Sequence, residues 1–182
     1  TNLDSVCDLV RAHHPCVYVP TFEEDYALQL VRDAGIRLGR GVWSWSIIRG
    51  VADALIADAP VESATENPVI GLARLAQIAE MKDHSAGMSG TNGPLLAMLD
   101  LVPHLSDDRT LRLLREVIPR VQRFGATLVL IDHRSELPPA VMADATRLDL
   151  SFPTRDELHD IVKSTLQWAH RGKPVRVSLS KK

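Results

Sequence analysis

The stretch that decides the fold is Cys16-Val17-Tyr18-Val19-Pro20-Thr21-Phe22-Glu23-Glu24-Asp25. Its first five residues are apolar, and the two valines and the tyrosine favour a buried strand. A threonine with a glutamate three residues later, at Thr21 and Glu24, is a capping-box pattern. It predicts a helix that begins there and continues to about residue 38. The chain therefore passes from a buried strand into a helix through a junction that is acidic and contains no glycine.

The same alternation of strands and helices continues along the chain. We expect further strands at residues 42–48, 95–99, 126–131 and 147–150. We expect further helices at residues 2–13 and 51–57, and helices that begin near residues 67, 106 and 154. Apolar strands that alternate with helices indicate an α/β fold with three layers, in which a parallel sheet has helices on both faces. In such sheets, ligands bind at the carboxyl ends of the strands.

Composition narrows the classes of partner. The chain has 182 residues, of which 45% are hydrophobic, so it can form a domain with a sizeable core. A net charge of −2 and an aromatic content of 4% favour no nucleic-acid partner, and no apolar run is long enough to suggest a membrane. Cys7 and Cys16 lie in apolar surroundings, which predicts reduced thiols and a cytoplasmic location. Because the chain starts at Thr1, we expect a piece of a longer protein.

Several strings resemble the core of AAA+ ATPases. Residues 95–100 (LLAMLD) lie where that core has its Walker B strand, and residues 128–140 (LVLIDHRSELPPA) resemble the sensor-1 strand with its following loop. Residues 148–158 (LDLSFPTRDEL) are similar to the segment that leads into the helical lid. More narrowly, the chain resembles the degenerate amino-terminal AAA-like domain of an uncharacterised AAA+ family of plastids and bacteria, through residues 14–25, 43–50 and 103–108.

This resemblance implies a fold and a larger protein. It implies a P-loop NTPase-like sheet of order 5-1-4-3-2, and we expect the Val17 strand to lie between the Leu128 and Leu96 strands. Residues 1–153 would form the AAA-like core, and residues 154–182 would begin a truncated helical lid or a linker to a following module. In that family, an intact ATPase module follows in the same chain. We therefore expect a parent ATPase, an adjacent AAA+ module, a protein partner and a homo-oligomer.

The departures from an active core concern the nucleotide site. The chain has no G-x-x-x-x-G-K-[ST] motif, so it lacks the Walker A loop whose glycines let backbone N–H groups surround a phosphate. The acids Glu23, Glu24 and Asp25 would repel a triphosphate instead. The resemblance places Asp100 at the metal-binding acid, but it places Leu101 where the catalytic glutamate belongs. We expect no catalytic residue and no ATP hydrolysis by this domain.

Polar residues at the predicted strand ends are the candidate site. The candidate cofactor-binding residues are Thr21, Asp100, Asp132 and His133, and the candidate partner-binding residues are Arg134 and Glu136. Either Asp132 or His133 holds the sensor-1 position, where asparagine is common. The plainer interpretations are a solvated strand end at Asp100 and an ordinary polar turn after Asp132. We name no cofactor; ATP with Mg²⁺ remains an alternative that no phosphate loop supports.

Other features favour structural interpretations. The histidines have no zinc-ligand spacing and no C-x-x-C pair occurs, so we expect no metal site. The glycine-rich residues 87–93 precede a strand instead of following one, which indicates a connector and not a phosphate loop. Trp43 and Trp45 alternate with serines and therefore face one side of the sheet. We expect them to pack in the core; an exposed pair would instead suggest a protein-binding patch.

Three functional hypotheses follow. The first is a degenerate, non-hydrolysing AAA-like domain of a larger AAA+ ATPase that acts in assembly, regulation or partner binding. The second is a domain that binds ATP or ADP at an altered site with weak or no ATPase activity. The third is a flavodoxin-like or receiver-like binding module, which strand order would distinguish from an AAA-type sheet.

Overall fold

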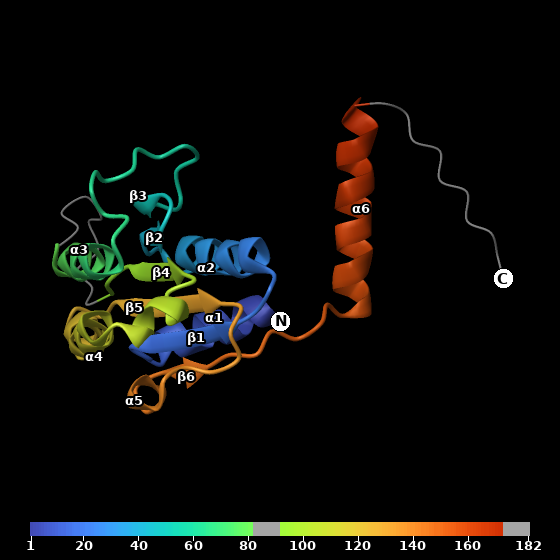
Figure 1. The fold of residues 1–182 in the computed structure, drawn as a ribbon. Helices are drawn as coiled ribbons and strands as arrows, with labels where there is room; N and C mark the ends of the chain where they lie inside the picture. The colour runs from blue at the N-terminus through green and yellow to red at the C-terminus, as the bar shows by residue number, and fades with distance from the viewer. Residues whose placement is uncertain (82–91, 173–182) are drawn as a thin grey trace. The chain divides into compact units, whose positions relative to one another are not determined.

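The computed structural model describes residues 1–81 and 92–172 (Figure 1). The chain divides into two compact units, residues 1–150 and residues 151–182. Most of the predicted connector at residues 87–93 lies outside the described residues. That the second unit begins a lid or a linker stays a prediction.

The first unit contains a six-stranded sheet. Its strands are β1 (Cys16–Pro20), β2 (Val42–Ser46), β3 (Gly50–Asp53), β4 (Leu95–Leu99), β5 (Thr127–Asp132) and β6 (Thr146–Arg147). Their spatial order is β3-β2-β4-β5-β1-β6, and each neighbouring pair is parallel except β2 with β3. The predicted parallel sheet is confirmed, with one antiparallel strand added at its edge.

The strand order confirms the AAA-type arrangement. Counted along the chain without β3, the strands stand in the order 5-1-4-3-2. The expected neighbours of the Val17 strand are wrong in one respect, because β1 lies between β5 and β6, with Val17 opposite Val129 and Thr146. The Leu96 strand, β4, pairs with the other side of β5. The implied order 5-1-4-3-2 already places the first strand between the fifth and the fourth, so the order is right and the Leu96 strand named as its neighbour is wrong.

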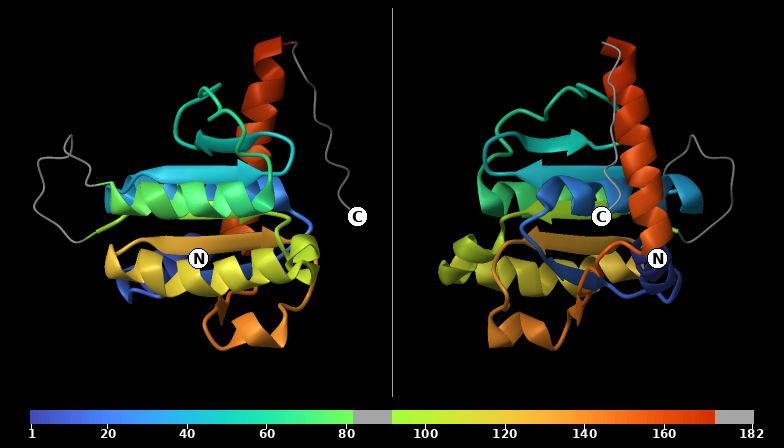
Figure 2. Two further views of the ribbon diagram at one scale, coloured as in Figure 1. Left: turned by 60° about the vertical axis from the view of Figure 1, so that its left-hand side comes forward. Right: turned by 90° about the vertical axis from the view of Figure 1, so that its right-hand side faces the viewer.

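Helices cover both faces of the sheet. They are α1 (Asn2–Arg11), α2 (Glu24–Leu38), α3 (Pro68–Glu80), the 3₁₀ helix η1 (Val102–Ser106), α4 (Asp108–Arg123) and α5 (Pro139–Met142). Val17 and Val19 of β1 pack in the cluster with α1 and α2, whereas Cys16 and Tyr18 pack in the cluster with α3 and α4. In the left view of Figure 2, α3 (green) and α4 (yellow) lie in front of the sheet. The three predicted layers are therefore confirmed.

One predicted helix start is confirmed, and the predicted capping of another helix is wrong. Asn67 caps α3 as expected, and its side chain accepts a hydrogen bond from the Val69 N–H. The capping box expected at Thr21 and Glu24 is wrong: α2 begins at Glu24 after Glu23, whose side chain makes no capping bond. Thr21 Oγ1 instead accepts a hydrogen bond from Glu23 N at 3.0 Å. This local turn uses the hydroxyl group that the box would need.

Residues 51–57 do not form the expected helix, because the first three of them belong to β3, the second strand of a hairpin. Gly50, with φ +72°, provides the left-handed backbone that this hairpin requires. The outer edge of β3 is covered: Val51 N donates to Thr65 Oγ1, and Val51 O accepts from Glu62 N, both at 2.8 Å. The chain itself therefore protects this edge from pairing with another strand.

Trp45 anchors the core on the face covered by α3 and α4, as its alternation with serines predicts. Its side chain is fully buried, and the indole N–H donates to Thr65 O at 2.7 Å. A Cβ atom at Gly71 of α3 would lie 2.2 Å from this indole nitrogen, so only glycine permits such a close approach. Trp43 is half-buried against the same cluster.

Both cysteines are buried thiols without a disulfide, as predicted. Burial raises the pKa of Cys16 to about 12, and burial also raises the pKa of Cys7. Neither thiol is therefore activated as a nucleophile.

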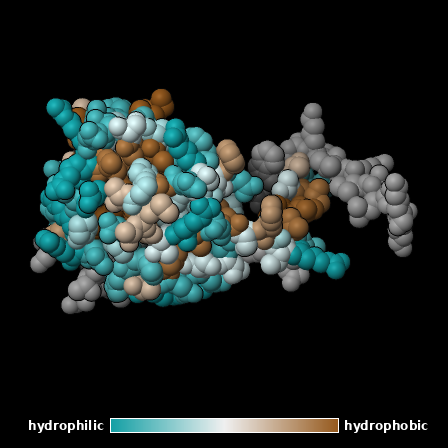
Figure 3. Space-filling model, turned by 60° about the horizontal axis from the view of Figure 1, so that its bottom comes forward, coloured by the Kyte–Doolittle hydropathy of each residue, from teal (hydrophilic) through white to brown (hydrophobic). Residues whose placement is uncertain are grey.

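The second unit contains α6 (Arg155–Gly172). The side chains of Leu158, Ile161, Val162 and Leu166 are exposed. The space-filling view in Figure 3 shows hydrophobic side chains on the surface among hydrophilic ones. Among the described residues, no helix is long and apolar enough to cross a membrane.

Candidate functional site

The predicted site residues lie together at the carboxyl edge of β1, β4 and β5. Two backbone hydrogen bonds join the three strand ends: Thr21 N donates to Asp132 O at 2.8 Å, and Asp100 N donates to Ile131 O at 3.0 Å. The structure therefore brings Thr21, Asp100 and the Asp132-His133 pair to one edge, as the strand ends predicted.

The junction between β1 and α2 has no room for a phosphate loop. Only residues 21–23 separate Pro20 from Glu24, whereas the phosphate-loop motif needs about eight residues. The first turn of α2 carries Glu24 and Asp25. Carboxylates stabilise the positive end of a helix, which a bound phosphate would otherwise occupy. The start of this helix therefore already carries negative charge from the protein itself.

Asp132 is built into the fold of this edge. Its side chain is completely buried, with Oδ2 accepting from Val102 N at 2.8 Å and Oδ1 accepting from Arg134 N at 3.0 Å. These two bonds fix the start of η1 and the turn after β5 to each other. The carboxylate thus has a structural role, which the sequence did not reveal.

His133 and Asp100 form a pair beside this buried carboxylate. The ring Nδ1 of His133 lies 2.9 Å from Asp100 Oδ1 and 3.6 Å from Asp132 Oδ1. Asp100 has the positive φ of +52°, a conformation that aspartate tolerates better than most residues. The exposed ring of Phe22 lies near the imidazole, with centroids 6.4 Å apart.

Glu24 belongs to this site, although it was not among the candidates. Burial raises its pKa, and repulsion from Asp100, Asp25 and Asp132 raises it further. The edge therefore gathers several carboxylates, whose charges oppose the ionisation of Glu24. The acidic junction signalled this negative potential in the sequence, but the proximity of Glu24 to the ends of β4 and β5 depends on the fold.

The other sequence candidates have different surroundings. Leu101, which the resemblance predicts at the place of the catalytic glutamate, is fully buried. Arg134 and Glu136 are exposed and remain candidates for partner contact. The Arg134 carbonyl accepts a hydrogen bond from the buried hydroxyl of Tyr18. Burial raises the pKa of Tyr18, and the charge of Asp132 adds to this effect.

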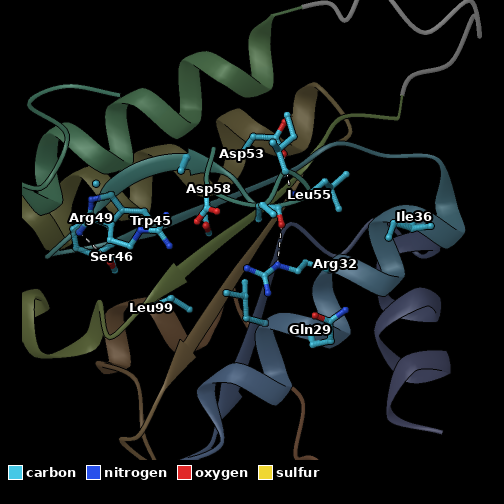
Figure 4. A pocket seen from close by; sticks show the side chains of 17 residues that line it. Gln29, Arg32, Ile36, Trp45, Ser46, Arg49, Asp53, Leu55, Asp58 and Leu99 are labelled. Atoms are coloured by element: carbon cyan, nitrogen blue, oxygen red, sulfur yellow. Dashed lines mark hydrogen bonds between the residues drawn. The ribbon is translucent and has the colours of Figure 1, made fainter. Parts of the chain in front are cut away.

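A pocket of about 420 Å³ lies elsewhere in the first unit, against α2 and the β2–β3 hairpin (Figure 4). Arg32 Nε donates to Ala54 O at 2.8 Å beside it. None of the predicted site residues lines this pocket. The pocket and the predicted site are therefore formed by different residues.

Comparison with known proteins identifies the family. No curated protein matches the chain. The structure of C. elegans PCH-2 is similar to 96% of this chain, with a TM-score of 0.58 and 12% identity, and this chain spans 50% of its length. That likeness shows the fold alone. The match to the structure of Drosophila ORC bound to GC-rich DNA and Cdc6 covers 93% of this chain and 68% of the ORC chain. Its identity is 12% and its TM-score is 0.38.

Residues 3–150 match the family model described as the N-terminal domain of SpoVK-like AAA ATPases. The match covers nearly all of the first unit, including β1, β4, β5 and the carboxyl edge between them. The AAA+ resemblance of the sequence is thereby confirmed, and the chain belongs to the family of SpoVK-like AAA ATPase N-terminal domains.

Proposed function

We propose that this AAA-like domain does not hydrolyse ATP and acts in assembly, regulation or partner binding within a larger AAA+ ATPase. The β1–α2 junction carries the proposal. Its three residues contain no glycine, and acidic residues follow at the helix start. A triphosphate at this position would meet Glu24 and Asp25 instead of free N–H groups and a lysine.

Two further observations support the loss of hydrolysis. Leu101 is a core residue, so the position that the resemblance gives to the catalytic glutamate offers no acid to orient an attacking water. Asp132 at the sensor-1 strand end accepts two backbone hydrogen bonds. Both side chains therefore have structural positions at the sheet edge.

The proposed role depends on protein surface. Arg134 and Glu136 are exposed beside the edge and are available to contact another protein. We place the expected partners in the same AAA+ assembly: an adjacent ATPase module of the parent chain, further copies of the chain, or a separate protein. The buried, reduced thiols agree with a cytoplasmic location.

An altered nucleotide site is the second candidate. The observation in its favour is that Asp100, Asp132 and His133 gather where related folds bind nucleotides. ATP or ADP with Mg²⁺ would then bind through Asp100 without a phosphate loop.

Phosphate release distinguishes hydrolysis from its absence. We expect the chain with ATP and Mg²⁺ to release phosphate no faster than buffer, because neither a phosphate cradle nor a catalytic acid is present. Asp100→Ala should give the same rate. Release above the buffer rate that disappears in Asp100→Ala would contradict the proposal and favour the altered site.

A further inference from the structure

We propose that Asp100, Asp132 and His133 form a binding site for a divalent first-row transition ion, with Zn²⁺ as the best fit. This site would operate without a nucleotide, and the inference does not depend on the proposed function. It departs from the sequence analysis, which predicted no metal site because the histidines lack zinc-ligand spacing. The fold brings together residues that lie 32 positions apart along the chain.

The donor atoms have suitable separations. One ligand atom from each of the three residues lies within 4.8 Å of the others. Zinc bonds of about 2.0–2.2 Å place neighbouring ligand atoms about 3.0–3.6 Å apart. The two distances from His133 Nδ1, 2.9 Å to Asp100 and 3.6 Å to Asp132, are close to this range. Rotation of the half-exposed Asp100 side chain can bring the third distance into it.

The donor types decide the class of ion. Mg²⁺ and Ca²⁺ prefer oxygen ligands, whereas an imidazole nitrogen with two carboxylates suits a borderline ion such as Zn²⁺. Three protein ligands with one open position are also typical of zinc sites that bind a further group. His133 would ligate through Nδ1 in the tautomer that carries its proton on Nε2, and this bond would replace its hydrogen bond to Asp100.

The surroundings orient the ligands. Asp132 cannot turn away, because its oxygens accept the Val102 and Arg134 N–H groups, and hydrogen-bonded carboxylates are the rule in metal sites. His133 and Asp100 are each about half exposed, with side-chain exposures of 49%, so an ion can enter from solvent. Glu24 adds negative potential from the same edge. A bound dication would relieve the repulsion among these carboxylates.

The test titrates Co²⁺ into the whole 182-residue chain, after chelation and without nucleotide, and follows visible absorption. We expect one saturable site from which Zn²⁺ displaces Co²⁺ and excess Mg²⁺ does not. His133→Gln and Asp100→Asn should each weaken binding by at least about 10–100-fold, because the loss of a direct ligand should cost no less than the loss of an outer-shell partner. Both positions are half-exposed, so these variants should keep the wild-type circular dichroism. His13→Gln is the matched control, because it removes an exposed histidine outside the cluster.

Three results would overturn the site. Absence of saturable binding at millimolar Co²⁺ is the first. The second is binding that His133→Gln and Asp100→Asn leave unchanged or that His13→Gln weakens, which would place the ion at surface histidines. The third is displacement by Mg²⁺, which would indicate a hard-cation site built from carboxylates alone.

Discussion

Replacement of Asp132 by alanine should lower the free energy of unfolding by about 3–5 kcal/mol. The carboxylate is fully buried and accepts hydrogen bonds from Val102 N and Arg134 N. Alanine would leave the buried Val102 N–H without an acceptor, and a buried unsatisfied donor costs about 1–3 kcal/mol. The part-buried Arg134 N–H would lose its partner as well. The cavity left by the carboxylate adds to the loss. Urea unfolding followed by circular dichroism measures the change.

Asp100→Asn is the matched control for this experiment. Asp100 lies at the same edge but is half-exposed, and asparagine also tolerates its positive φ. We expect a change within about 0.5 kcal/mol. Similar losses in the two variants, or a loss below about 1 kcal/mol in Asp132→Ala, would show that the buried hydrogen bonds do not stabilise this edge.

Replacement of Trp45 by alanine should also cost about 3–5 kcal/mol, because it removes a large side chain from a closely packed core. The indole is fully buried, lies against Gly71 and forms an edge-to-face contact with His104 at 6.5 Å between ring centroids. Trp45→Phe keeps most of the volume but loses the hydrogen bond to Thr65 O, so we expect a smaller loss of about 1–2 kcal/mol.

Trp43→Ala tests whether full burial of the side chain determines the loss in the free energy of unfolding. Trp43 lies on the same face of β2 but is only half-buried, so its loss should be clearly smaller than that of Trp45→Ala. Chemical unfolding of the three variants supplies the comparison. Equal losses at the two tryptophans would contradict the central position assigned to Trp45.

The sequence predicted the elements with continuous local patterns. β1 and β4 are apolar throughout, β5 is apolar between Thr127 and Asp132, and the burial of these strands on both faces follows from that composition. The Asn67-Pro68 pair marked the start of α3 correctly, because capping and a proline at the first position act within one turn. Local rules suffice where local contacts decide the structure.

Features that depend on distant residues could not be predicted in this way. The hairpin at β3 needs the partner strand β2 and the covering residues Glu62 and Thr65. Arg40 is buried, and its guanidinium donates to the Gly93 and Gly125 carbonyls. Nothing in the residues near Arg40 indicates these contacts, since they join loops that only the folded sheet brings together.

In the candidate site too, local sequence predicted some features, and others depend on distant residues. The strand ends indicated where Asp100, Asp132 and His133 would meet, because the carboxyl ends of parallel strands share one edge. The sequence could not show that Asp132 is hydrogen-bonded to Val102, since that bond joins residues 30 positions apart. It also could not show that His133 Nδ1 faces two carboxylates, from which the metal site is inferred.

Calorimetry of ATP and ADP, each with Mg²⁺ and with transition metals removed, tests most directly whether this domain has lost its nucleotide site. We predict no saturable heat at millimolar nucleotide, for the wild-type chain and for Asp100→Ala alike, because acids occupy the place of the phosphate loop. Saturable binding to the wild-type chain that is lost in Asp100→Ala would contradict this prediction and show that the carboxyl edge still binds nucleotide.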